Sequence, residues 1–171
     1  LVGVERSDLG RGHVVCHERL ERVTRRLDAW VEIRPGARRA VASHARVRFH
    51  LGTAEVLGKL VVLGGAAELP PRSRGWAQLV LAEDVLALRG DRFILRDETA
   101  RWTLGGGQVV NPFADRHRGR DVGAVDRLVV LRDGAAPAAA RAFLDLTPEF
   151  ASDRGIVAQA LDLREEDAGA V

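Results

Sequence analysis

The chain has 171 residues, which is enough for one mid-sized domain or for a small domain with part of another. Its hydrophobic share of 46% indicates a globular protein with a real core, and no apolar run approaches the ~18 residues of a membrane helix, so we expect no membrane partner. The net charge is only +2 and the basic side chains are nearly all arginine, so the number of arginines identifies no partner and their positions must do so.

The N-terminal part of the chain predicts a tail followed by the first strands. The sequence has no methionine, so we expect a piece of a longer protein in which residues 1–9 are the tail of a preceding domain. Apolar side chains predict strands at residues 12–15 and 23–33, whereas the arginine-rich residues 18–26 fit a helix or a strand equally well. Cys16 is the single cysteine, which excludes a disulfide framework and a multi-cysteine zinc site and fits a cytoplasmic location.

Two histidines in this region, His13 and His17, lie beside Cys16 and Glu18 and suggest a metal site. On a strand, however, residues four apart share a face without converging on one point, and zinc needs a third and a fourth ligand from elsewhere. We therefore interpret the segment as a plain strand with a buried cysteine and predict no metal.

The clearest strand covers residues 45–51, where apolar and polar side chains alternate strictly. Its polar face carries Arg46 and His50, and a solvated outer face is the simplest interpretation of this face. Turn residues separate the later strands, which are predicted at residues 55–63, 76–81, 85–88 and 91–95.

Short strands divided by glycine and proline turns are typical of an antiparallel barrel or sandwich. The number of strands favours a mainly β fold with a six-stranded antiparallel barrel over residues 10–113. The apolar members of the alternating runs should point inward, and they are Val47, Phe49, Leu51, Leu79, Leu81, Phe93 and Leu95.

The composition changes after the barrel. Residues 114–123 are polar, basic and glycine-flanked, which predicts a linker. Residues 124–171 show helical periodicity with a stop at Gly134 and a proline, Pro137, where the first turn of a helix tolerates it. Helix, helix, short turn and helix start is the order of a helix-turn-helix unit, so we predict a small helical, partial winged-helix segment that packs apart from the barrel.

One stretch gathers residues that suit a nucleic-acid backbone. A strand ends in Arg96, a polar turn leads to Arg101 and Thr103, and the glycines at 105–107 follow. Guanidinium groups match phosphate oxygens, and glycines let a backbone come close to a partner. The alternative is purely structural: Arg96 pairs with a neighbouring aspartate, Asp91 or Asp97, and the glycines only let the barrel close.

The same stretch resembles a known family. Its sequence, RFILRDETARWTLGGGQVV, is similar to the end of the third domain of the elongation factor Tu superfamily. The upstream segment VRFHLGTAEVLGK resembles the second conserved strand pair of that domain, in the form found in the selenocysteine-specific branch. GIVAQALDLREED resembles the first winged-helix repeat in the C-terminal half of those factors.

The resemblance implies a Tu-type barrel that contributes to binding the T-stem backbone of selenocysteinyl-tRNA and packs on the GTP-binding domain of the same chain. It implies a parent protein that uses GTP and magnesium, acts on the ribosome and reads an mRNA hairpin through winged helices. The residues that it places toward nucleic acid are Arg96, Arg101, Thr103, Gly105, Gly106, Arg38, Arg39, Arg46 and His50. Trp102 departs from the arginine-threonine pair that is usual in the family, which puts the register of Arg101 in question by one position.

Two other functions compete with this one. The sequence has no phosphate loop of the type GxxxxGK[ST] and no nucleophile elbow, so we expect this chain to be no enzyme and to hold no cofactor of its own. A barrel from another translational GTPase, acting as a protein-interaction module, would show the same pattern. A small metal-dependent hydrolase built on the N-terminal histidines is the other alternative.

Overall fold

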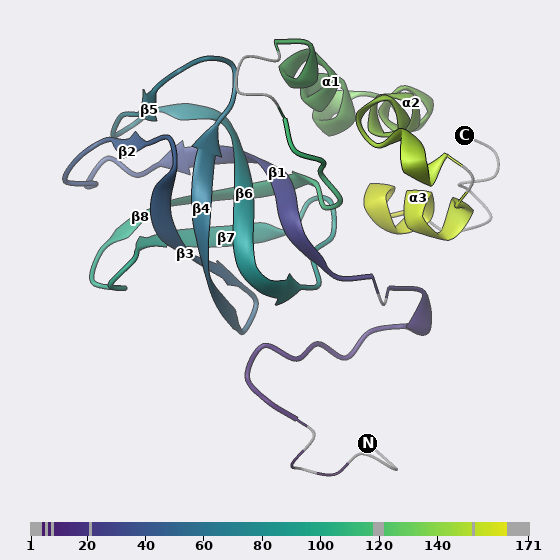
Figure 1. Cartoon of the computed structure of the whole chain (residues 1–171), viewed down its shortest axis with the longest axis horizontal. Helices are drawn as coiled ribbons and strands as arrows, with labels where there is room; N and C mark the ends of the chain where they lie inside the picture. The colour runs from purple at the N-terminus through teal and green to yellow at the C-terminus, as the bar shows by residue number, and fades with distance from the viewer. Residues whose placement is uncertain are drawn as a thin grey trace.

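The computed structural model describes residues 5, 7, 9–20, 22–117, 122–151 and 153–163. Its main body is a closed barrel of six antiparallel strands, with helices on one side (Figure 1). This confirms the predicted fold. The barrel strands in chain order are β1 (Thr24–Ile33), β3 (Ala45–Leu51), β4 (Ala54–Val62), β6 (Arg74–Val85), β7 (Arg92–Asp97) and β8 (Thr103–Asn111).

Around the barrel the strand order is β1-β6-β4-β3-β7-β8, and β8 closes the ring by pairing with β1. Two short strands, β2 (Val41–Ala42) and β5 (Glu68–Leu69), form a separate antiparallel pair beside one end of the barrel. Sequence periodicity missed this pair because two residues are too few to show alternation.

The predicted elements before and within β6 need correction. Residues 12–15 form no strand, and Val14 and Val15 are exposed, because no neighbouring strand offers them backbone partners. Cys16 is likewise exposed rather than buried. Residues 18–26, which fitted either element, hold a 3-10 turn and then the start of β1. The strand predicted at 76–81 is longer than expected, since pairing with β1 extends β6 as far as Val85. The separate strand predicted at 85–88 is wrong, because residues 86–88 lie outside any strand.

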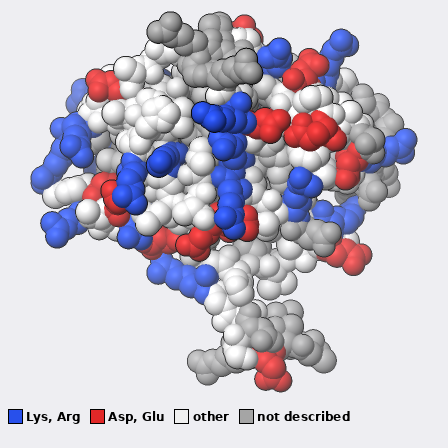
Figure 2. Space-filling model, viewed as in Figure 1, with Lys and Arg blue, Asp and Glu red and all other residues white. Residues whose placement is uncertain are grey.

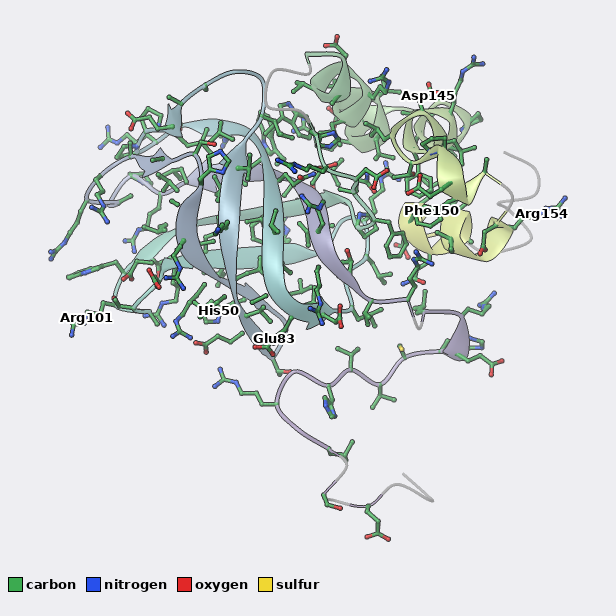
Figure 3. The ribbon with its side chains drawn as sticks, in the orientation of Figure 1. His50, Glu83, Arg101, Asp145, Phe150 and Arg154 are labelled. Carbon is green, nitrogen blue, oxygen red and sulfur yellow. The ribbon has the colours of Figure 1, made fainter. Side chains whose placement is uncertain are left out.

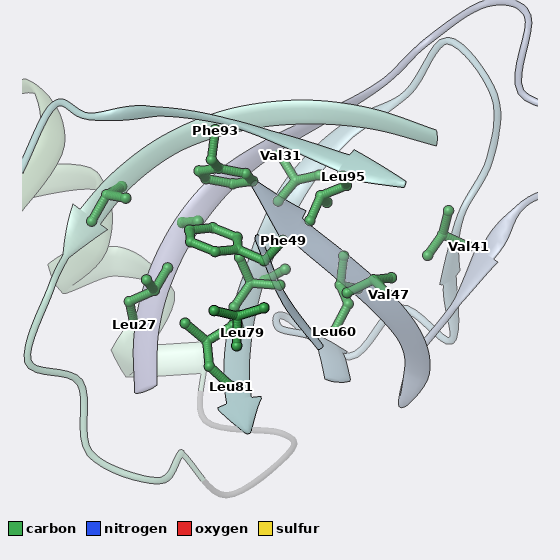
Figure 4. Packing of buried hydrophobic residues seen from close by; sticks show 14 of the residues in the cluster. Leu27, Val31, Val41, Val47, Phe49, Leu60, Leu79, Leu81, Phe93 and Leu95 are labelled. Atoms are coloured by element: carbon green, nitrogen blue, oxygen red, sulfur yellow. The ribbon is translucent and has the colours of Figure 1, made fainter. Parts of the chain in front are cut away.

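The barrel interior is filled by the inward side chains of the alternating runs (Figure 4). The predicted inward residues are buried except Leu51, which is half-buried at the end of its hairpin. The rings of Phe49 and Phe93 lie 5.0 Å apart, in the range of favourable aromatic pairs. Burial of each such side chain contributes about 1.5–3 kcal/mol, so this register is strongly specified.

The helices are α1 (Val122–Asp133), α2 (Ala136–Leu146) and α3 (Arg154–Leu161). The predicted stop of the first helix is confirmed, because α1 ends directly before Gly134. None of the helices in the described part of the chain is long and apolar enough to span a membrane. The predicted start of a further helix at residue 164 falls outside the described residues.

The prediction that the helical segment packs apart from the barrel is wrong. Trp76 and Val110, on the outer surface of the barrel, share a buried cluster with Leu128 of α1 and Phe143 of α2. The guanidinium of Arg132 also lies over the ring of Trp30, 4.5 Å from its centroid. The outer side of β1, β6 and β8 is therefore apolar where the helices cover it. The sequence did not indicate this packing, because the polar segment after the barrel suggested a linker between separate parts.

A buried polar cluster fastens that segment to the barrel. Asp28, on β1, is fully buried, and its carboxylate accepts a hydrogen bond from the Gln78 amide at 2.9 Å and lies 2.8 Å from Nε2 of His117. Gln78 also donates to the carbonyl oxygen of Asp115 at 2.7 Å. Burial raises the pKa of Asp28, and the hydrogen bond with His117 opposes that rise without cancelling it.

This raised pKa predicts how stability depends on pH. An aspartate that holds its proton to a higher pH in the folded state stabilises the fold fully below its unfolded pKa, and it loses that contribution as pH rises through the folded pKa. We expect the free energy of unfolding of the wild type, relative to Asp28→Asn, to fall as pH rises from about 4. The slope should not exceed about 1.4 kcal/mol per pH unit, the limit for one proton.

The measurement is urea unfolding of both proteins across this pH range. Asp84→Asn is the matched control, because Asp84 lies exposed in an ion pair with Arg25 and its pKa is lowered. A difference between wild type and Asp28→Asn that does not change with pH would contradict the prediction.

Candidate nucleic-acid interface

The turn between β7 and β8 is organised by one carboxylate. Asp97 accepts hydrogen bonds from the backbone amide and hydroxyl of Thr99 and from the backbone amide of Trp102. These bonds, those from Thr99 first, lower the pKa of Asp97. Ala100 adopts a left-handed conformation with φ of 58°, which reverses the chain. The turn is therefore a fixed platform from which the next two side chains project.

Those two side chains are Arg101 and Trp102, and both are exposed. The guanidinium of Arg38 stacks on the Trp102 indole, with its central carbon 3.4 Å from the ring centroid. This contact joins the loop of residues 34–40, after β1, to the β7–β8 turn. The structure thus brings the loop that carries Arg38 and Arg39 against the turn that carries Arg101, which Figure 3 labels at the tip of the turn. The sequence placed them in one surface only through the family resemblance.

Arg96 lies inward of this tip, on the outer face of β7. It stands opposite Arg48 of β3 on one side and Thr103 of β8 on the other. The structural alternative of a pair with Asp91 or Asp97 is not observed. Within the described residues Nε of Arg96 is buried without a hydrogen-bond partner. An unpartnered buried guanidinium nitrogen is costly, so this group is a candidate for an incoming acceptor.

The polar face of β3 is largely neutralised by acidic side chains. Arg46 forms an ion pair with Glu98 at 2.9 Å, and Arg48 pairs with Glu55 at 2.7 Å. His50, the third member of this face, lies farther along the strand (Figure 3), and its Nε2 is buried with no hydrogen-bond partner among the described residues. Arg46 and His50 therefore contribute less to a positive surface than the loop arginines do.

The exposed arginines of the loop 34–40 and of the β7–β8 turn form no salt bridge with any described residue; they are Arg34, Arg38, Arg39 and Arg101. Arg72, whose amide donates to the carbonyl oxygen of Ile33, is likewise exposed at this end without a salt bridge to a described residue. Figure 2 shows basic side chains at the left end of the barrel, where Figure 3 places Arg101, with acidic side chains along its lower edge. The positive charge is concentrated on the two loops rather than on the strand face.

The glycine triplet closes the barrel. A Cβ at Gly105 would lie 2.1 Å from the carbonyl oxygen of Glu32, and one at Gly107 would lie 2.2 Å from that of Trp30. These distances are impossible for a side chain, so the structural alternative accounts for the triplet. The same glycines also leave a surface hollow of about 600 Å³, bordered by Thr103, Gly105 and Gly106 and by basic and apolar side chains, among them Arg34, Arg92 and Ile94.

Sequence reasoning missed Arg34, Arg92 and the hollow itself. Gly106 pairs with Glu32 on one side and with Ile94 on the other, both on the outer face, so the missing side chain leaves a depression there. Alternation within β8 would have placed Gly106 outward, but a strand register is needed to know which neighbours surround it.

The histidines near the N-terminus do not form a site with other ligands. His13 Nδ1 accepts from the Gly10 amide at 3.2 Å, and His17 Nδ1 accepts from the Arg19 amide at 3.3 Å. Across the described ranges no group of three or more His, Cys, Asp or Glu side chains is placed to hold a metal ion.

Comparison with known proteins decides the family. Residues 26–116 match the family model described as the β-barrel domain of the selenocysteine-specific elongation factor, and this range is more than half of the chain. This chain belongs to that family. The selenocysteine-specific elongation factor of Desulfomicrobium baculatum is 27% identical over 118 residues, which are 69% of this chain and 18% of that protein.

The part that belongs to the selenocysteine-factor barrel family contains both loops of the candidate interface. The matched range runs from β1 to Arg116, so it includes residues 34–40 and the β7–β8 turn but none of the three helices. The chain spans about a fifth of the length of its Desulfomicrobium relative. How Arg96 and Arg101 act toward nucleic acid stays a prediction.

The glycine contacts predict a sharp effect on stability. Gly105→Ala places a methyl group against the backbone of β1, and the two strands must separate to accept it. We expect the free energy of unfolding to fall by about 2 kcal/mol or more. Gly155→Ala is the matched control, because Gly155 lies in α3 where the nearest atom is 3.4 Å from a new Cβ and alanine favours helix. Denaturant unfolding of both variants is the measurement; a Gly105→Ala protein as stable as the wild type would contradict the close approach.

Proposed function

We propose that this barrel is part of a selenocysteine-specific translation elongation factor and that it contacts the T-stem backbone of selenocysteinyl-tRNA. The observation that carries the proposal is the convergence of Arg38, Arg39 and Arg101 on two loops held together by the stack on Trp102. Family membership supports the assignment to an elongation factor, and the position of the arginines supports the contact with RNA.

The chemistry of this contact is electrostatic. A guanidinium group presents a planar fork of donors that matches two phosphate oxygens, and it stays charged at every physiological pH. Double-stranded RNA offers its phosphates and 2′-hydroxyls at the surface and hides most base edges from side chains. Arg101 at the tip and Arg96 behind it would therefore hold the backbone of a stem without reading its sequence.

The parent protein, in this proposal, is a GTPase that acts in the cytoplasm on the ribosome. GTP and magnesium belong to its GTP-binding domain, against which the barrel packs, and an mRNA hairpin is bound by winged helices farther along the parent chain. Support comes from the likeness to the selenocysteine-specific elongation factor of Desulfomicrobium baculatum, which is much longer than this chain. The barrel itself supplies position and charge.

One observation favours a second function, a protein-interaction module. The hollow over Gly106 combines the exposed side chain of Ile94 with the edge of Trp30 and two flanking arginines, Arg34 and Arg92. A mixed apolar and charged depression of this kind suits a protein surface. The two functions share Arg34, Thr103 and the glycines, but Arg101 does not border the hollow, so Arg101→Ala separates them.

The proposal predicts weak, salt-sensitive binding of a tRNA acceptor–T-stem duplex. Each phosphate contact releases counterions, so affinity falls steeply as salt rises. Arg101→Ala and Arg96→Ala should each lower affinity about equally for stems of different sequence. Each should also reduce the slope of log affinity against log salt by roughly one. Binding measured at several salt concentrations tests this.

Arg154→Ala is the matched control, because Arg154 is an exposed arginine at the start of α3, at the opposite end of the molecule from Arg101 (Figure 3). It should leave both affinity and slope unchanged. If Arg96→Ala and Arg101→Ala bind like the wild type at every salt concentration, the turn closes the barrel and binds no RNA. If only Arg96→Ala weakens binding, the doubt in register raised by Trp102 is resolved against Arg101.

A further inference from the structure

Trp102 is an exposed aromatic ring at the tip of the basic surface, and its stack with Arg38 uses only part of the ring. It retains 48% of its exposure in a protein whose other two tryptophans lie against the helices. A ring presented beside arginines without ion-pair partners suits a ligand that is both planar and anionic.

The indole is stacked on one side and half exposed. Arg38 lies over one face of the ring with its guanidinium carbon 3.4 Å from the centroid. The side chain keeps about half of its area accessible, and with one face covered that area must come mainly from the other face and the rim. The stacked guanidinium also fixes the ring, since the indole cannot turn without losing this contact.

The backbone beneath the ring is fixed as well. The amide of Trp102 donates to the Asp97 carboxylate, and its carbonyl oxygen accepts from the Asp97 amide at 2.9 Å. These hydrogen bonds hold the backbone of Trp102 and do not involve its side chain. A rigid, half-open ring loses little conformational entropy when a second planar group stacks on it.

We propose that the Arg38–Trp102 stack is a platform for one unpaired nucleobase of RNA. The inference rests on the proposed function, because the arginines that hold a phosphate backbone bring the base within reach. Bases of paired stems are stacked inside the helix, so the base must come from a loop, bulge or single-stranded end of the bound RNA. The platform reads no sequence, since every base has a face that can stack.

Charge favours RNA over a protein partner at this point. Arg38 lies over the ring, Arg101 precedes it in the chain, and neither they nor Arg39 forms a salt bridge with the described residues. The ring therefore lies in a locally positive surface, which an anionic RNA backbone complements. The apolar hollow begins at Thr103 and extends away from the turn, over Gly106. The hollow adjoins the basic surface through Arg34 and Thr103, but Trp102 does not border it.

The experiment compares the full chain with Trp102→Leu and Trp102→Phe. The probe is single-stranded oligoadenylate of about twelve nucleotides. Its duplex with oligouridylate is the control probe, because pairing and stacking hide the same base faces inside the helix. We expect Trp102→Leu to lose roughly 5- to 150-fold in affinity for the single strand, with an unchanged salt slope, and Trp102→Phe to keep most of the affinity. The single strand should quench tryptophan fluorescence in the wild type and not in Trp102→Phe, which retains the other two tryptophans.

Both variants should fold, because the hydrogen bonds between Asp97 and the backbone of the turn do not involve the Trp102 side chain. Equal midpoints of thermal unfolding for the wild type and both variants check this. If Trp102→Leu binds the single strand like the wild type and the wild-type fluorescence is not quenched, the platform is overturned. Binding of the tRNA acceptor–T-stem duplex shows whether a failure concerns the platform or the proposed function. Loss of stem binding in Arg101→Ala with no effect of Trp102→Leu keeps the stem contact and removes the platform. Quenching by the single strand with no arginine effect on the stem keeps the platform and removes the T-stem assignment.

Discussion

The close approach of β8 to β1 is the constraint on which the rest of the molecule depends. Three consecutive glycines bring the backbone of β8 so near the carbonyl oxygens of Glu32 and Trp30 that no side chain fits between them. This approach closes the ring of six strands and leaves no open edge. It also sets the end of β1 beside the start of β8, so that the loop after β1 and the turn before β8 meet.

The meeting of these two loops makes the candidate interface. Residues 34–40 continue from β1 and residues 98–102 lead into β8, so the register of the closing strands decides how far apart their side chains lie. The Arg38 guanidinium then stacks on Trp102 and turns two separate loops into one surface. The acidic side chains of Glu55 and Glu98 neutralise Arg48 and Arg46 on the neighbouring face of β3, whereas the arginines of the two loops have no such partners among the described residues.

The helices depend on the barrel in a different way. Their apolar faces pack on the outer surface of β1, β6 and β8, and the buried carboxylate of Asp28 holds the connecting segment through Gln78 and His117. A buried polar cluster tolerates few other arrangements, because each of its groups needs its partner once water is excluded. The helical segment therefore shares a buried apolar cluster with the outer surface of the barrel.

The sequence by itself determined the barrel, its inward residues and the family. Strict alternation in residues 45–51 and 91–95 specified which side chains enter the core, because a slip of one residue would expose all of them. The motif around Arg96 and the glycines carried the family resemblance.

Only the tertiary structure decided that the helices pack on the barrel, since Trp76 and Val110 look in the sequence like ordinary strand residues. It also decided that Arg38 stacks on Trp102, that Glu98 neutralises Arg46 in an ion pair, and that Asp28 is buried. Each of these facts concerns which residues become neighbours across strands far apart in the chain, and local periodicity contains no information about such contacts.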